Sequence, residues 1–170
     1  MKIIFALFAL TMSLAASAQT DGKTYLELAY GAIKYQEPGA WATPGVGMIR
    51  LGSNIDKNIS LEGLIGTTIT DAYSGNVAFR FDSVFGGYIK ARTDIGPNAQ
   101  VFGRLGFTQG TATASVPSYA VSGSDSGLSY GVGAQFDFAS KTYVIIDYMS
   151  YYSNSGVSAS GISGGIGIKF

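Results

Sequence analysis

The sequence contains no cysteine and no histidine in its 170 residues, and it has only 4 prolines. Without cysteine and histidine the chain can form no disulfide framework, no zinc site of the usual ligand types and no thiol nucleophile. The absence of imidazole also removes the commonest general base at neutral pH. We therefore expect no catalytic residue, no metal site and no cofactor.

The chain also has no excess of charge of either sign. Its 11 basic and 11 acidic side chains give a formal net charge of zero. A nucleic-acid-binding domain normally carries a basic surface, so nucleic acid is not an expected partner. The length fits a single domain.

Only one long run is almost wholly apolar, and it lies near the amino terminus. Residues 3–14 follow Lys2 and precede the small-residue motif Ala16-Ser17-Ala18. Such a run is shorter than the roughly 20 residues of a transmembrane helix but is typical of a secretory signal peptide. We predict that residues 1–18 are cleaved between Ala18 and Gln19, leaving a mature domain of residues 19–170. The alternatives are a buried amino-terminal helix or an uncleaved anchor.

The mature chain shows a repeated alternation of apolar and polar residues, which indicates strands with one apolar face. In residues 128–138, for example, Leu128, Tyr130 and Val132 alternate with Ser129 and Gly131. Eight such segments occur, near residues 24–34, 45–54, 59–69, 77–91, 101–108, 128–138, 144–152 and 162–170. The alternation is least regular in the seventh segment.

The connections between these segments alternate in length. Short ones are expected near residues 55–58, 93–98 and 139–141, and longer ones, rich in Gly, Ser and Pro, near residues 35–44, 70–76, 110–126 and 153–159. This pattern is typical of outer-membrane barrels with short periplasmic turns and longer external loops. We predict an all-β protein, an eight-stranded antiparallel up-and-down transmembrane β-barrel. The alternative is a soluble barrel such as a lipocalin, with the apolar face inside.

The small lumen of an eight-stranded barrel favours the membrane interpretation. Eight strands enclose only enough room for side chains to fill, and the large apolar side chains of every strand would crowd it. With the polar face inward, the lumen receives the charged residues Glu27, Arg50, Glu62, Asp82, Arg104 and Asp147. We predict that Arg50 and Arg104 form a structural ion cluster with these carboxylates, rather than a catalytic site.

The carboxyl-terminal segment Ser163-Gly164-Gly165-Ile166-Gly167-Ile168-Lys169-Phe170 ends on an aromatic residue. Ser163, Gly165, Ile168 and Phe170 match the positions of the assembly signal of bacterial outer-membrane barrels. The chain as a whole resembles the small eight-stranded outer-membrane barrel family, which includes adhesin/invasion-related proteins and the membrane domain of outer-membrane protein A. The resemblance implies a location in the bacterial outer membrane and recognition by the barrel-assembly machinery.

Members of this family differ in role, and a fold does not fix a function. We expect a monomer in outer-membrane lipid that presents external loops for surface interaction or adhesion, or that supports the membrane structurally. The alternative is a small pore or transporter for ions or small solutes, which a filled lumen disfavours.

The cleavage site gives the first prediction. Protein purified from the outer-membrane fraction should have a mass that corresponds to an amino terminus at Gln19, because the motif Ala16-Ser17-Ala18 fits signal peptidase. Intact-mass spectrometry measures this directly. Retention of residues 1–18 in that fraction would contradict the assignment.

Overall fold

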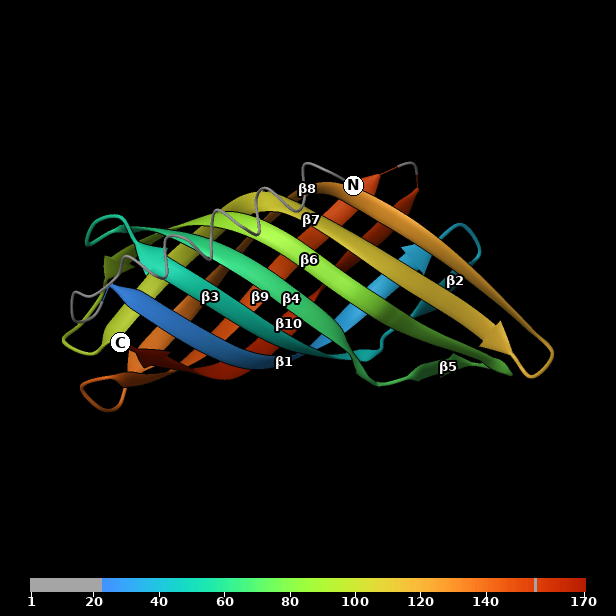
Figure 1. The fold of residues 1–170 in the computed structure, drawn as a ribbon, viewed down its shortest axis with the longest axis horizontal. Coiled ribbons are helices and arrows are strands. Elements are labelled where there is room, and N and C mark those ends of the chain that lie inside the picture. The colour runs from blue at the N-terminus through green and yellow to red at the C-terminus, as the bar shows by residue number, and fades with distance from the viewer. Residues whose placement is uncertain (1–22, 155) are drawn as a thin grey trace.

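The computed structural model describes residues 23–154 and 156–170, and within them it contains ten β-strands (Figure 1). The predicted signal peptide therefore lies outside the described residues. The strands are β1 (Thr24–Glu37), β2 (Ala40–Ala42), β3 (Gly45–Asn54), β4 (Ile59–Thr70), β5 (Ala72–Ser74), β6 (Val77–Asp94), β7 (Ala99–Val116), β8 (Tyr119–Asp137), β9 (Thr142–Asn154) and β10 (Val157–Lys169). β2 and β5 are three-residue strands, and the other eight are long. Among the described residues, no helix is long and apolar enough to cross a membrane.

The eight long strands form one closed antiparallel barrel. Their order is β10-β9-β8-β7-β6-β4-β3-β1, and β10 also pairs with β1, from Tyr25 opposite Lys169 to Gln36 opposite Ser158. Closure gives each of these strands two neighbours, so the backbone groups inside a membrane are paired and no edge meets lipid. The predicted fold class is confirmed.

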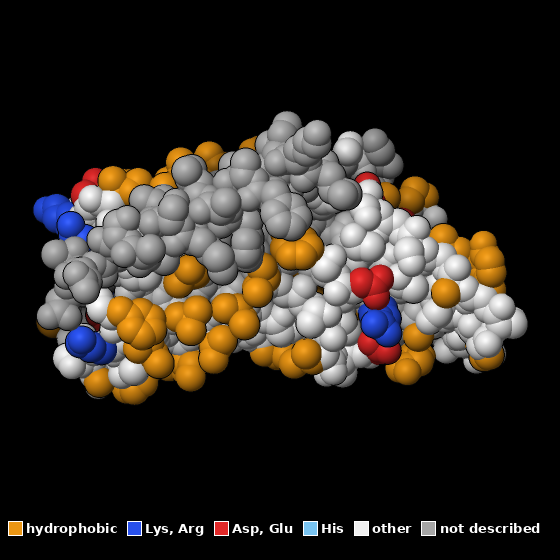
Figure 2. All heavy atoms as spheres, in the orientation of Figure 1, with side chains coloured by type: hydrophobic (Ala, Val, Ile, Leu, Met, Phe, Trp, Pro, Cys, Tyr) orange, Lys and Arg blue, Asp and Glu red, His pale blue; other side chains and the backbone are white. Residues whose placement is uncertain are grey.

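Over most of the barrel wall, the apolar face of the strands points outward. On β8, Leu128, Tyr130 and Val132 are 57–66% exposed, whereas Ser129 and Gln135 are buried. Figure 2 shows hydrophobic side chains spread over the left part of the barrel surface, and a mostly uncharged polar surface toward the right. An apolar exterior around a polar interior suits a barrel surrounded by lipid.

The two ends of the barrel differ. The turn end carries the short connections after β3, β6 and β8, where Ile55 N–H donates to Ile59 O and Ile95 N–H to Ala99 O, each at 2.9 Å. The hairpin end, on the right of Figure 1, carries β2, β5 and the tip of the β7–β8 hairpin. These are the short periplasmic and the longer external connections of the predicted barrel.

The predicted long loop at residues 110–126 is wrong. Most of this segment continues β7 and β8 as a paired ladder up to Val116 opposite Tyr119, so only residues 117 and 118 form the turn. The composition of this segment predicted a loop because it is rich in Ser, Thr and Gly. The same residues suit a two-stranded ladder that projects into a polar environment, where neither face has to be strongly apolar.

The orientation of β8 gives the second prediction. Val132→Arg should reduce the free energy of unfolding by about 2–4 kcal/mol, because Val132 lies outward among the lipid-facing residues. Val121→Arg is a matched control, since Val121 is 53% exposed on the same strand but belongs to the projecting hairpin. Urea unfolding in phospholipid vesicles should show a large loss for the first variant only. Equal effects of the two substitutions would show that Val132 does not face lipid.

Candidate functional site in the barrel lumen

The lumen contains a layer of six buried charged side chains, which we call the ionic layer. Each comes from a different strand, and each residue is at most 3% exposed: Glu27, Arg50, Glu62, Lys90, Arg104 and Asp147. Three positive and three negative groups balance to zero. Such a balance is needed because an unpaired charge in a closed, water-poor interior is costly.

Arg104 of β7 is the centre of the layer. Its Nε lies 2.5 Å from Glu62 Oε2, its Nη1 2.5 Å from Asp147 Oδ2, and its Nη2 2.8 Å from Glu27 Oε2. The three carboxylates come from β4, β9 and β1. A planar guanidinium with donors in a fixed fork can hold three acceptors at once, which an ammonium on a flexible stem does less precisely. Arg104 thereby links four strands across the lumen.

Lys90 and Arg50 complete the layer. Lys90 Nζ lies 3.1 Å from Glu27 and 3.4 Å from Glu62, and it sits 4.5 Å from the ring centre of Phe102. Arg50 Nη1 lies 3.3 Å from Asp147 Oδ2 and 3.7 Å from Glu27 Oε2, without hydrogen-bond geometry to either. Arg50 is therefore held mainly by electrostatic attraction, and Arg104 by hydrogen bonds as well.

Hydroxyl groups satisfy the remaining acceptors of the carboxylates. Tyr25 donates to Glu62 at 2.6 Å, Tyr143 donates to Glu27 at 3.1 Å, and Ser163 donates to Asp147. The two tyrosine rings fit because Gly52 and Gly167 lie beside them: a Cβ at either glycine would come within 2.1 Å of a ring carbon. On the inner face of the sheet, each tyrosine ring covers the space that a side chain at the neighbouring glycine would otherwise fill.

An apolar layer closes the lumen between the ionic layer and the hairpin end. Its buried residues include Ile33, Val46, Leu64, Phe81, Val84 and Met149. The tyrosines of this layer also have partners: Tyr88 shares a hydrogen bond of 2.6 Å with Thr108, and Tyr151 donates to Met48 Sδ at 3.3 Å. Both layers fill the interior with side chains that solvent does not reach. This arrangement can brace a barrel, and its charged groups are engaged with one another.

The structure brings together five of the six residues predicted for the ion cluster, and it places Asp82 elsewhere. Asp82 is exposed, where it accepts from Arg80 at 3.0 Å and from Thr113 at 2.5 Å. Phe81 pairs with Ala112 and Ser83 with Thr111, so Asp82 is the extra residue of a β-bulge. The bulge reverses the faces beyond it, which also turns Phe79 and Phe81 inward rather than toward lipid.

Lys90 is the member of the ionic layer that the sequence analysis did not include. The alternation on β6 does place it on the inward face, together with Tyr88. Its partners could not be found from the sequence, because Glu62 lies diagonally opposite on the paired strand β4 and Glu27 comes from β1 across the lumen, and both contacts depend on the pairing of strands.

The residues of the predicted assembly signal lie along β10 and at its end. Ser163 points into the lumen, Gly165 pairs with Ala29, and Ile168 is 43% exposed on the outer face. Phe170 is 54% exposed, and its N–H donates to Thr24 O at 2.8 Å. The predicted cleavage site at Ala18 and Gln19 lies outside the described residues.

The ionic layer gives the third prediction. Arg104→Met should lower the free energy of unfolding by about 3–5 kcal/mol, because it leaves three buried carboxylates without their shared partner. Arg80→Met is the control, since the Arg80–Asp82 pair is largely exposed and should contribute less than about 1 kcal/mol. Urea unfolding of the detergent-solubilised barrel measures both losses. Similar small losses would mean that the ionic layer does not stabilise the fold.

Comparison with known proteins agrees with this architecture. Attachment invasion locus protein Ail of Yersinia pestis has 18% identity and a TM-score of 0.66, with 89% of this chain and 100% of that chain covered. Neisserial surface protein A has 14% identity and a TM-score of 0.71, covering 86% and 97% of the two chains. The amino-terminal barrel domain of Pseudomonas aeruginosa OprF has 10% identity and a TM-score of 0.66, covering 89% and 100%. At these identities the likeness concerns the fold.

The comparison with curated protein sequences gave no match. A family model, in contrast, matches almost the whole sequence. The model describes an outer membrane protein beta-barrel domain, and it covers residues 3–170. The closed barrel with its apolar exterior agrees with this description. The chain belongs to the outer membrane protein beta-barrel domain family, and it is an integral barrel of the bacterial outer membrane.

Proposed function

We propose that this protein has no catalytic activity and binds partners at the cell surface, with the barrel as a rigid mount for the external hairpins. One observation carries the proposal: three external hairpins each present a large exposed aromatic side chain. These are Trp41 on β2, Tyr73 on β5 and Tyr119 at the start of β8, which are 63%, 73% and 69% exposed. Tyr and Trp are the residue types most enriched among those that contribute most of the binding energy at protein interfaces.

The surroundings of these aromatics support a binding role. The external hairpins are rich in Ser and Gly, and the combination of Tyr or Trp anchors with small polar residues is the composition of antibody paratopes. Tyr73 lies on a strand paired to β6, and Tyr119 pairs directly with Val116. Rings held on paired strands lose little freedom on binding, which favours affinity.

The charge of the external end indicates the chemistry of the partner. Its basic residues are Lys34 and Arg80, and its acidic residues are Glu37, Asp71, Asp82 and Asp125, so the net charge is 2 − 4 = −2. Lys34 already lies 5.7 Å from the ring centre of Trp41, and Arg80 is paired with Asp82. Ail has been solved in complex with the heparin analogue sucrose octasulfate. For this chain we propose a neutral or weakly basic partner, bound through aromatic contacts.

The filled lumen argues against the pore or transporter alternative. The ionic layer and the apolar layer leave their side chains almost inaccessible to solvent, with Lys90 at 0% and Arg50 at 1% exposure. Water-filled channels are found in barrels of about 16 strands or more. Support of the membrane without a soluble partner is the remaining alternative, but it does not explain the exposed aromatics.

The fourth prediction tests the binding role. Vesicles carrying the protein should bind to at least one member of an immobilised panel of extracellular-matrix proteins and neutral glycans, but not to heparin. Replacing Trp41, Tyr73 and Tyr119 together by Ala should weaken that binding by about tenfold or more, since aromatic anchors commonly contribute 2 kcal/mol or more each. Surface plasmon resonance measures the affinity.

The matched control replaces Ile55 and Ile95 by Ala, because these are exposed apolar residues (63% and 64%) at the opposite, turn end. This variant should bind like the native protein. Unchanged binding by the aromatic triple variant would contradict the proposal. Steady single-channel openings of the native protein in planar bilayers would instead favour the pore.

A further inference from the structure

A polar flank extends the lipid-facing surface of β7 and β8 beyond the hydrocarbon core of the membrane. Phe107 and Leu128 are opposite each other, point outward, and are 57% and 60% exposed. The next three outward pairs toward the hairpin end carry only hydroxyl and amide groups. We call them the hydroxyl ladder: Gln109 with Ser126, Thr111 with Ser124, and Thr113 with Ser122. The outward face thus changes from apolar to polar in a single step.

The height of the hydroxyl ladder places it beside the headgroups. From Gln109 to Thr113 the strand advances by 4 residues, which is about 14 Å along the strand and about 10 Å of height at a tilt of 45°. A bilayer carries a polar layer of roughly 5–8 Å on each side of its hydrocarbon core. Since the ladder begins directly above the last apolar pair, it faces the polar layer of the outer leaflet.

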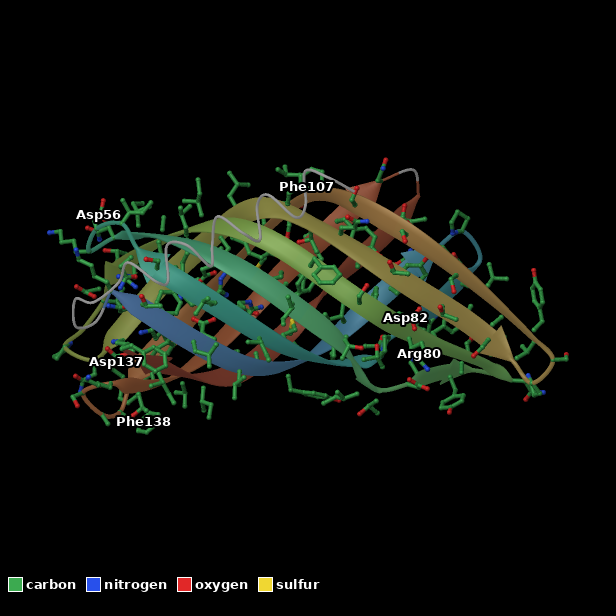
Figure 3. The ribbon with its side chains drawn as sticks, in the orientation of Figure 1. Asp56, Arg80, Asp82, Phe107, Asp137 and Phe138 are labelled. Atoms are coloured by element: carbon green, nitrogen blue, oxygen red, sulfur yellow. The ribbon has the colours of Figure 1, made fainter. Side chains whose placement is uncertain are left out.

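The hydroxyl groups of the ladder are oriented by a chain of hydrogen bonds. Arg80 Nε donates to Asp82 Oδ1 at 3.0 Å, and Thr113 donates its single hydroxyl hydrogen to Asp82 Oδ2 at 2.5 Å. Figure 3 shows Arg80 and Asp82 close to each other toward the hairpin end, far from Asp56 and Asp137. In the 2.6 Å pair between Thr113 and Ser122, the serine must therefore be the donor. Its oxygen keeps lone pairs for an external donor.

The neighbouring pair offers the complementary group. Thr111 and Ser124 are 2.8 Å apart, and one hydrogen bond between them uses only one of their two hydroxyl hydrogens. The ladder can therefore both accept and donate hydrogen bonds along a flat, nearly uncharged surface. Its one flanking cation, Arg80, is already neutralised by Asp82. These properties match the hydroxyl groups of sugars better than an array of phosphates, which would call for several free Arg or Lys side chains.

We infer that the hydroxyl ladder binds the sugar headgroups of glycolipid in the outer leaflet. The occupant follows from continuity with the lipid-facing surface: a glycolipid whose acyl chains pack near Phe107 and Leu128 presents its sugars at the height of Thr111 and Thr113. This site is the flank of the projecting sheet, whereas the proposed partner site is at the hairpin tips. The inference therefore does not rest on the proposed function.

The experiment measures binding of fluorescently labelled lipopolysaccharide to the full-length mature protein in phospholipid nanodiscs. Removing four hydroxyls with Thr111→Val, Thr113→Val, Ser122→Ala and Ser124→Ala should weaken binding by about tenfold or more, because every hydrogen bond that these groups make to the sugars is lost. Thr93→Val is the control, because Thr93 is exposed on β6 at the turn end, within the opposite leaflet. It should leave the affinity unchanged.

Two further measurements identify the chemistry. Binding should persist in 0.5 M salt, whereas its loss there would assign it to phosphates and overturn the inference. Free core oligosaccharide should compete, although more weakly than the glycolipid because it lacks the acyl chains; no displacement by the oligosaccharide at any concentration would also overturn the inference. Heat-modifiable gel migration establishes that each variant is folded, and Ser122→Ala alone provides a milder variant with a smaller loss. Equal affinity of the folded native and ladder variants would disprove the inference.

Discussion

The contact of Arg104 with three carboxylates is the interaction on which the rest of the structure depends. Glu27, Glu62 and Asp147 approach it from three different strands, in a lumen that solvent does not reach. None of these groups could be buried alone, because the loss of hydration is offset only by close opposite charges and hydrogen bonds. The ionic layer therefore acts as a unit: six charges balance only when the six strands that carry them are in register around a closed barrel.

The closed lumen has consequences for function. With the ionic layer and the apolar layer both filled, the described interior side chains are almost inaccessible to solvent, and the six charged ones lie within ion-pair distance of one another. The part of the molecule that is free to interact is the exterior, first the apolar surface toward lipid, then the hydroxyl ladder, and finally the aromatic tips of the hairpins. A rigid scaffold that presents its outer elements is a common basis for binding.

The sequence predicted those features that depend on alternation along a single strand. Period-2 patterning placed all eight strands, and it assigned Glu27, Arg50, Glu62, Arg104 and Asp147 to the inward face, because a strand determines its two faces locally. The pattern along a single strand did not predict the features that depend on how two strands pair. The bulge at Asp82 is created by the register of β6 against β7, and the partners of Lys90 lie on other strands, Glu62 on the neighbouring β4 and Glu27 on β1 across the lumen. The segment 110–126 has a composition that suits a loop and a projecting ladder equally well, so only its pairing distinguishes the two.

The bulge on β6 connects the interior of the barrel with its exterior. Because Asp82 is an extra residue in β6, Phe79 and Phe81 point into the interior of the barrel. Phe81 belongs to the apolar layer and packs edge-on against Tyr35, with 5.9 Å between the two ring centres. The same reversal turns Arg80 and Asp82 to the outer face, and Asp82 then fixes the direction of the hydrogen-bond chain through Thr113 to Ser122. Had the alternation continued without the bulge, a carboxylate would face the apolar layer and two phenylalanines would stand among the hydroxyls. A single local irregularity thus both brings Phe81 into the apolar layer and orients the hydrogen bonds of the polar flank.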